Sequence, residues 1–251
     1  MERKGVTNPM SMWLSLLFFG IPTVLFTLSI YVGMPYLGFR GVNPIVNYTV
    51  TLMGPVILLF FASFAAFKLE GHPMNWKTVR KRFRLNTLNK KEWGWVLGLS
   101  LFMLLGNVIF MPTQNWLLSN VSLAIPDFLP STLDPRITVS GLPPEFASEP
   151  MASIIFFQLF FMFFNIFGEE LWWRGYILPR QELAHGKHTW LIHGLLWTLF
   201  HSFWWWNLLV LLPGALAAAF VAQKLKNTTI LILAHLLVNS LGGVIVMLIN
   251  S

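Results

Sequence analysis

The sequence predicts an all-α membrane protein, a polytopic bundle of about seven transmembrane helices with six to eight as the range. Of its 251 residues, 55% are hydrophobic and 11% are charged, whereas about a quarter of the residues in a typical soluble domain are charged. Uncharged apolar runs of about 20 residues recur along the chain, each long enough to cross a hydrocarbon core of about 30 Å. The chain has no cysteine, which excludes disulfides and thiolate metal ligands.

The first part of the chain, residues 1–150, contains three apolar segments and two polar loops. The apolar segments, which we predict to be membrane helices, are residues 12–32, 44–67 and 93–111. The loop 68–91 is basic, with eight Lys and Arg. The loop 112–150 holds seven prolines, which exclude a long helix and leave a structured cap or a lid as alternatives.

The second part of the chain, residues 151–251, contains four apolar segments separated by short polar turns. We predict membrane helices at residues 151–173, 188–206, 208–223 and 228–249. We expect this part to form a helical core that carries the functional site.

The distribution of basic residues predicts the orientation of the chain. With seven spans and an inner N terminus, 15 of the 17 Lys and Arg fall on the inner side, and only Arg40 and Arg136 fall outside. Cytoplasmic loops of membrane proteins collect Lys and Arg. We therefore predict a cytoplasmic N terminus, and a loop 68–91 that anchors the topology against anionic lipid headgroups rather than forming a specific binding patch. The net charge of +7 thus needs no nucleic acid as a partner, and without an organelle signal we favour a bacterial plasma membrane.

Two adjacent carboxylates and an arginine close the segment 151–173. Ionisable groups in such a segment are costly and indicate a functional site, although solvated residues at a helix end are the alternative. Glu170 and Arg174 are four residues apart with the acid first, which favours an ion pair. Glu169 points about 100° away on the same helix. It is then freer to act as a general base.

Three further polar residues inside apolar segments are candidates for the same site: His201, His235 and Asn239. His235 and Asn239 are four residues apart and share one helix face. At 1.5 Å per residue, His201 lies roughly 15–20 Å from the inner end of its helix, and His235 and the two glutamates roughly 10 Å from theirs. Their convergence in the inner half of the bilayer predicts one shared site, whereas a single membrane histidine could simply bond a neighbouring helix.

These side chains suit hydrolysis of a peptide bond. A carboxylate and a histidine can activate water, and a His/Asn pair can donate to an oxyanion. The other histidines are interpreted as interface or loop residues. They are His72, His185, His188 and His193.

At these residues the sequence resembles the CPBP family of intramembrane proteases, also called the Abi family, which includes CAAX proteases and bacteriocin-processing enzymes. The resemblance covers residues 151–250. The family's first motif, Glu-Glu-x-x-x-Arg, matches residues 169–174, and its third, His-x-x-x-Asn/Asp, matches residues 235–239. Its second, Phe-x-x-x-His, matches residues 197–201 with Trp197 in place of phenylalanine.

The resemblance implies an intramembrane endopeptidase that cuts membrane-associated or lipidated peptides and proteins. It implies that Glu169 and His201 activate water, and that His235 and Asn239 stabilise the oxyanion. We expect no cofactor. Zinc held by Glu169, His201 and His235 is the alternative, which we disfavour because Asn239 is a poor zinc ligand.

Two other classes of function stay open. One is a non-catalytic immunity factor or scaffold of the same fold, which keeps the motifs for structure. The other is a transporter or proton relay, which also uses intramembrane Glu and His. The convergence of the polar residues at one depth disfavours a relay across the membrane.

Overall fold

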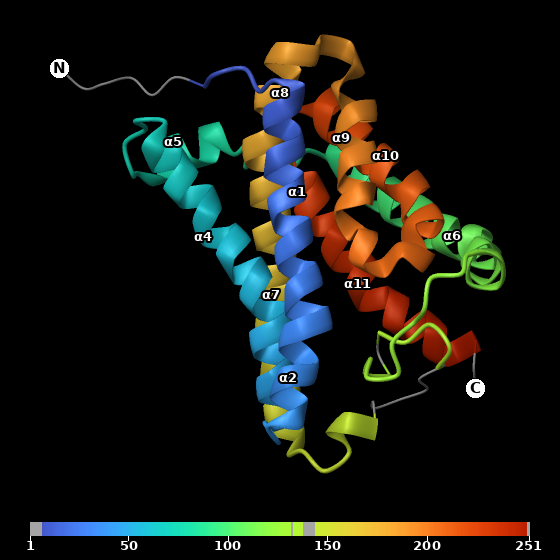
Figure 1. The fold of residues 1–251 in the computed structure, drawn as a ribbon. Helices are drawn as coiled ribbons and strands as arrows, with labels where there is room; N and C mark the ends of the chain where they lie inside the picture. The colour runs from blue at the N-terminus through green and yellow to red at the C-terminus, as the bar shows by residue number, and fades with distance from the viewer. Residues whose placement is uncertain (1–6, 132, 138–143, 250–251) are drawn as a thin grey trace.

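A computed structural model describes residues 7–131, 133–137 and 144–249 of the chain, and the described residues contain helices and no strand (Figure 1). Arg3 and Lys4, which were counted above among the basic residues, lie outside the described residues. The described helical stretches that are long and apolar enough to cross a membrane number four: Met12–Phe39, Pro44–Leu69, Lys90–Asn120 and Met151–Leu225. Thr228–Leu241 is a shorter apolar helix. The chain is thus an integral membrane protein, and the count of about seven spans stays a prediction.

The first two stretches are bent helices that continue through prolines. The first consists of α1 (Met12–Leu28), a π-helical turn η1 (Ser29–Gly33) and α2 (Met34–Phe39). The second consists of α3 (Pro44–Tyr48), a π turn η2 (Thr49–Met53) and α4 (Gly54–Leu69). The predicted end of the first helix at residue 32 was therefore wrong, because the helix runs on to Phe39.

The third stretch is longer than predicted. The short α5 (Trp76–Arg82) lies within the basic loop, and α6 (Lys90–Asn120) then runs through Pro112. We had placed the start of the irregular segment at residue 112, but it begins only after Asn120. A single proline inside a long helix removes one backbone hydrogen bond, and a long apolar helix can tolerate that loss.

The fourth stretch is one long helix followed by two shorter ones. α7 (Met151–Glu170) continues through a π-helical segment η4 (Leu171–Ile177) into α8 (Leu178–His185). The loop predicted after residue 173 is therefore helical as far as His185. A turn η5 (Gly186–His188) leads to α9 (Thr189–Phe200), the 3₁₀ segment η6 (His201–Asn207) and α10 (Leu208–Leu225). α11 (Thr228–Ile249) has the predicted bounds.

All three π segments have the same relation to a proline. Each ends two residues before one, at Pro35, Pro55 and Pro179. After η1 and η2 the next backbone N–H, that of Met34 or Gly54, bonds a carbonyl five residues back. Proline clashes with the carbonyl four residues before it, so the wider turn lets the helix continue without breaking.

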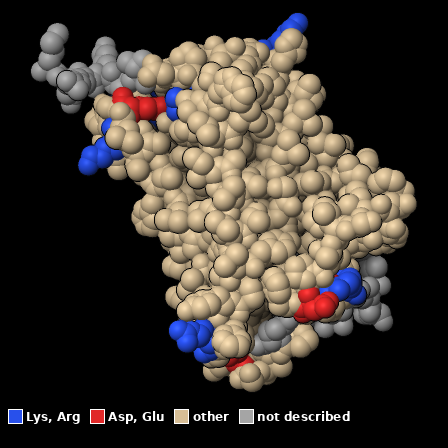
Figure 2. All heavy atoms as spheres, in the orientation of Figure 1, with Lys and Arg blue, Asp and Glu red and all other residues tan. Residues whose placement is uncertain are grey.

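Charged side chains are confined to the ends of the visible face. In Figure 2 a broad uncharged belt separates the charged groups near the upper end from those near the lower end. The start of α1, α5 and α8 lie at one end of the molecule, and α2 lies at the other (Figure 1). Such a belt is what a hydrocarbon core requires of the surface that it contacts.

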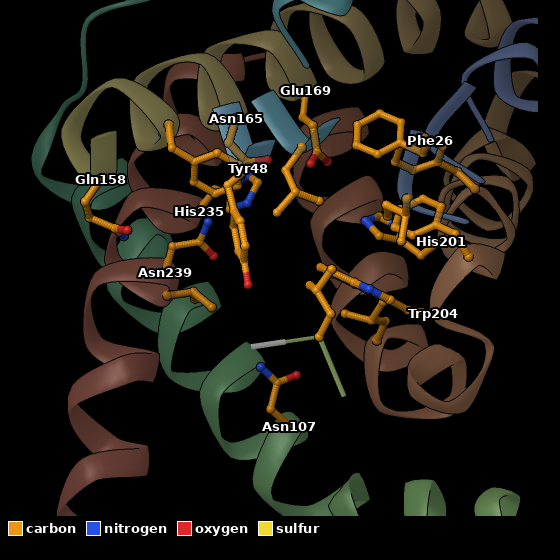
Figure 3. Close-up of a pocket in the computed structure, with 18 of the residues that line it drawn as sticks. Phe26, Tyr48, Asn107, Gln158, Asn165, Glu169, His201, Trp204, His235 and Asn239 are labelled. Carbon is orange, nitrogen blue, oxygen red and sulfur yellow. The ribbon is translucent and has the colours of Figure 1, made fainter. Parts of the chain in front are cut away.

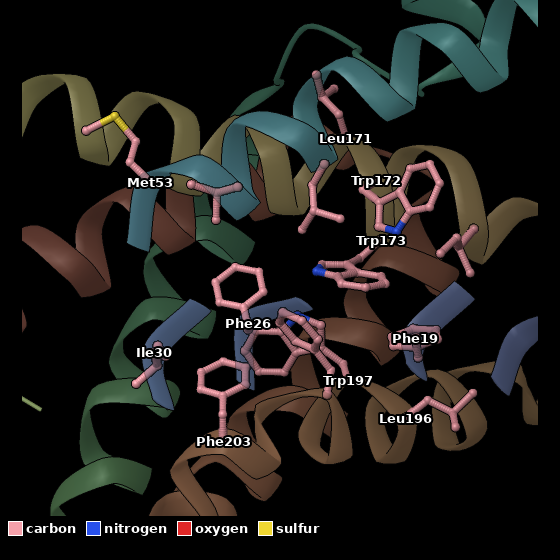
Figure 4. Packing of buried hydrophobic residues seen from close by; sticks show 14 of the residues in the cluster. Phe19, Phe26, Ile30, Met53, Leu171, Trp172, Trp173, Leu196, Trp197 and Phe203 are labelled. Carbon is pink, nitrogen blue, oxygen red and sulfur yellow. The ribbon is translucent and has the colours of Figure 1, made fainter. Parts of the chain in front are cut away.

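Aromatic packing joins the two parts of the chain. The rings of Phe19 and Trp173 stack with centroids 4.4 Å apart, and those of Phe26 and Phe203 with centroids 5.1 Å apart (Figure 4). These pairs tie α1 to η4 and to η6. One buried cluster therefore contains residues of both 1–150 and 151–251. The division of the chain into these two parts stays a prediction.

α7 approaches α4 very closely beside the first carboxylate. A Cβ atom added to Gly168 would lie 2.5 Å from the carbonyl oxygen of Val56. Because that neighbour is backbone, it cannot move aside without shifting α4. Gly168 therefore sets the position of the helix turn that carries Glu169.

The described part of the segment after α6 is irregular and held by ion pairs. Arg136 contacts Asp134 at 2.7 Å and Asp127 at 3.0 Å. The hydrogen bonds and positive charge of the Arg136 guanidinium hold the pKa of Asp134 below its usual range, against the opposing effect of burial. Leu133 and Phe146 (the latter in the 3₁₀ turn η3, Pro144–Phe146) reach the cavity described below.

Candidate functional site

The predicted site residues come from the end of α7, from η4, from the start of η6 and from α11. Glu169 and Glu170 end α7, and Arg174 lies in η4. All three are buried, with exposed fractions of 6%, 2% and 2%. π segments inside helices frequently occur at functional sites. Here the π segment follows the two glutamates directly.

Glu170 is the centre of a buried charged cluster. Its Oε1 atom accepts a hydrogen bond from the Arg174 guanidinium at 3.2 Å, which is the predicted pairing. The same oxygen lies 3.0 Å from Nδ1 of His235. Because a carboxylate only accepts hydrogen bonds, Nδ1 of His235 carries the proton of that bond. Glu170 therefore connects α11 to the end of α7.

Glu169 has a different partner. Its Oε2 atom accepts a hydrogen bond from the indole Nε1–H of Trp197 on α9, at 3.2 Å. The Trp197 ring also lies under the Arg174 guanidinium, with 4.7 Å from Cζ to the ring centroid. We had noted Trp197 only as an aromatic at the phenylalanine position of the second motif. Phenylalanine has no N–H, so the hydrogen bond to Glu169 depends on the tryptophan.

His201 lies in the predicted helical stretch, but at the first residue of a 3₁₀ helix and not within an α-helix. α9 ends at Phe200, and His201 begins a 3₁₀ segment that is kinked at Trp204. Nδ1 of His201 lies 2.9 Å from the carbonyl oxygen of Trp197. A carbonyl only accepts, so Nδ1 is the protonated nitrogen and Nε2 of a neutral ring keeps its lone pair. The imidazole also packs against the Trp197 ring, with centroids 4.4 Å apart.

A cavity of about 670 Å³ lies between these helices (Figure 3). The side chains of Glu169, His201, His235 and Asn239 line it, on an otherwise mainly apolar wall. Glu170 and Arg174 are not among the residues that line it. The two glutamates thus differ in position as their spacing predicted, with Glu169 toward the cavity and Glu170 behind it in the ion pair.

The described residues do not provide a ligand set for a metal ion. No group of three or more His, Asp or Glu side chains among them lies close enough together to hold one. Glu169, His201 and His235, the alternative zinc ligands, therefore do not form such a group. The hydrogen bond that occupies Oε2 of Glu169 comes from an indole N–H, which is not a metal ligand.

The remaining histidines lie away from the cavity. His193, which we had interpreted as an interface residue, is instead fully buried, with Nδ1 2.7 Å from the Gln181 side-chain oxygen. His72 lies 3.2 Å from a Glu70 carboxylate oxygen. Neither is among the residues that line the cavity.

The basic loop contacts the π segment directly. Arg82 is buried, pairs with Glu70 at 2.7 Å and donates to the carbonyl oxygens of Gly175 at 3.0 Å and Tyr176 at 3.3 Å. A Cβ atom added to Gly175 would lie 2.9 Å from the Phe83 ring. One arginine of loop 68–91 therefore holds the segment that carries Arg174, a role that the topology argument did not predict.

Comparison with known protein families gives a match over the second part of the chain. Residues 151–241 match the model of the type II CAAX prenyl endopeptidase Rce1-like family. This range contains all six predicted site residues, and the match is consistent with the resemblance to the CPBP family. Comparisons with curated proteins and with solved structures gave no match.

Proposed function

We propose that this integral membrane protein, whose residues 151–241 form an Rce1-like domain of the type II CAAX prenyl endopeptidase kind, hydrolyses peptide bonds with a water activated by Glu169. The observation that carries the proposal is the cavity. A buried carboxylate, two imidazoles and an amide line one mainly apolar space, each from a different position along the chain (Figure 3).

In the proposed reaction Glu169 takes one proton from water while the water oxygen attacks the carbonyl carbon of the substrate. Nε2 of His201 has a free lone pair and accepts a hydrogen bond from the same water, which orients it. When the C–N bond breaks, the proton held by Glu169 passes to the leaving amine. The water thus supplies the OH of the new carboxyl group and a proton of the new amine, and the enzyme is unchanged.

The opposite wall supplies donors to the oxyanion. The amide of Asn239 donates an N–H in its ordinary state. Nδ1–H of His235 is already bonded to Glu170, so His235 donates to the oxyanion only through a proton on Nε2. Fixed donors in a site with little water are effective at stabilising a developing negative charge. Glu170 and Arg174 act as positioning residues in this proposal.

We propose that the reaction needs no metal ion, since the described residues offer no three-ligand group. The test is to incubate purified protein with a zinc chelator, remove it, and measure both bound zinc and peptide cleavage. Cleavage should persist in zinc-free protein. Stoichiometric zinc whose removal abolishes cleavage and whose return restores it would contradict this part of the proposal.

The proposed substrates are membrane-associated peptides, including lipidated ones. We propose a cytoplasmic N terminus, with loop 68–91 beside anionic headgroups and the Glu169 end of the cavity toward the cytoplasmic face. This orientation places most Lys and Arg inside. It lets a substrate anchored in the inner leaflet reach the site laterally. The proposed location is a bacterial plasma membrane.

The deciding experiment compares membrane peptides by mass spectrometry in cells that express the wild type, Glu169→Gln or Asp127→Asn. The Asp127 carboxylate is 95% exposed, so its substitution is the matched control. Cleavage products should be present with the wild type and with Asp127→Asn and absent with Glu169→Gln. Equal products or an equal phenotype with Glu169→Gln would instead favour a non-catalytic scaffold or immunity factor.

A further inference from the structure

Three side-chain amides line the cavity besides Asn239. They are Asn107 on α6 and Gln158 and Asn165 on α7 (Figure 3). Among the described residues, none of the three has a hydrogen-bond partner, although Asn107 and Asn165 are partly buried. Unpaired amides are costly in an apolar environment. Polar residues inside membrane segments usually face a partner or a functional cavity.

The two amides of α7 form one row with the glutamate. Gln158, Asn165 and Glu169 are separated by seven and four residues, so they share a face of the helix. At 1.5 Å per residue the row is about 16 Å long. An extended peptide of five residues spans the same length, at about 3.3 Å per residue. Asn107 lies on a different helix and faces the same space (Figure 3).

The chemistry of the row matches a peptide backbone. A primary amide carries two donors and an acceptor, and each residue of an extended peptide offers one N–H and one C=O. A prenyl or acyl chain offers neither. A phosphate group would call for cations, but the residues that line the described cavity include no Lys or Arg.

We infer that Asn107, Gln158 and Asn165 bind the backbone of the substrate, which lies extended along α7 for about five residues with its scissile bond at the Glu169 end. The inference rests on the proposed function and extends it. The apolar wall of the cavity receives side chains or a lipid group, and the amides fix the register of the peptide. Specificity then depends more on an unfolded, accessible segment than on charged side chains.

The experiment measures binding separately from hydrolysis. The probe is a fluorescein-labelled, prenylated eight-residue peptide with a CAAX terminus, titrated by fluorescence anisotropy against detergent-purified protein carrying Glu169→Gln. Asn107→Leu, Gln158→Met and Asn165→Leu keep side-chain volume and remove the amide. Each should raise the dissociation constant about three- to tenfold, as expected for one neutral hydrogen bond. Asn115→Leu, on an exposed position of α6 outside the cavity, is the control and should change it less than about twofold.

Peptides with single N-methylated amides identify the backbone contacts. Methylation at the matching position should weaken binding to the parent protein and not to the variant that lacks the partner amide, because the two losses are not additive. Unchanged dissociation constants in all three variants, or no saturable binding, would overturn the inference. Amide-dependent binding together with no hydrolysis of the same peptide by the wild-type protein would overturn the proposed function and leave the assignment of the amides to the peptide backbone standing.

Discussion

Trp197→Phe tests whether the hydrogen bond from Trp197 positions the Glu169 carboxylate. The substitution keeps an aromatic ring at this position and removes the N–H that bonds Glu169, together with one ring of the indole. It also restores the residue found in the second motif of the family that the chain resembles. If the N–H fixes the Glu169 carboxylate, catalysis should fall while the fold stays intact.

The expected size of the effect follows from the bond. A hydrogen bond to a charged group contributes about 1.5–3 kcal/mol. The observed distance of 3.2 Å is long for such a bond, so the lower value of about 1.5 kcal/mol applies. That energy corresponds to roughly a tenfold lower kcat/KM. Trp197→Leu also removes the ring contacts with Arg174 and His201, and should lower it by roughly a hundredfold.

The assay follows cleavage of a quenched prenylated peptide by protein in proteoliposomes, with melting temperature measured on the same samples. Trp190→Phe is the matched control. Trp190 lies on the same helix, and its indole N–H bonds no described residue. The control should keep wild-type kcat/KM. If Trp197→Phe stays within about twofold of the wild type at equal expression, Trp197 does not position Glu169.

Three further predictions concern stability. Gly168→Ala should destabilise the protein by about 1–3 kcal/mol and reduce cleavage, because the new Cβ meets the carbonyl oxygen of Val56 on α4. The control is Gly106→Ala, whose new Cβ has no neighbour within 4 Å and which should leave the melting temperature unchanged. Arg174→Ala leaves the buried Glu170 carboxylate without its arginine partner. The free energy of unfolding, measured by chemical denaturation, should fall by about 3–5 kcal/mol. Normal folding with full activity would contradict the pairing. Asp134→Asn should speed proteolysis of the segment after α6 at pH 7. The reason is that Arg136 lowers the pKa of Asp134 in the folded state, so the ionised carboxylate stabilises the fold at any pH above its unfolded pKa of about 3.9. That stabilisation is lost as the pH falls through the lowered pKa, so the two proteins should become equally sensitive in acid, and a difference that persists there would contradict the assignment.

The helices were predictable from apolar length, and their ends were predictable only in part. α11 has the predicted bounds because polar residues flank a clean apolar run. The predicted helix ends at residues 32 and 111 were wrong, because the helices continue through Pro35 and Pro112. Proline is a weaker stop signal in an apolar helix than in a soluble one, since wider turns can rearrange the bonds that it removes.

The position of the site residues followed from spacing where one helix carries both partners. The Glu170–Arg174 pair needed only the helical repeat. The Trp197 contact with Glu169 joins α7 to α9 across 28 positions of sequence, and no helical repeat determines it. The row of Gln158, Asn165 and Glu169 was visible in the sequence as polar residues on one face of an apolar helix. The amides of Gln158 and Asn165 are not ionisable, so the cost of charge in an apolar segment did not single them out.

The contact of Arg82 with the carbonyl oxygens of Gly175 and Tyr176 makes loop 68–91 and the site thermodynamically linked. A ligand of the loop that bound more tightly when Arg82 is released from these carbonyl oxygens would favour that release by the difference in its two binding free energies. Such a relation is reciprocal, so occupation of the cavity would then change the affinity of the loop by the same factor. The loop that we propose to lie beside anionic headgroups would thereby also respond to a peptide in the cavity.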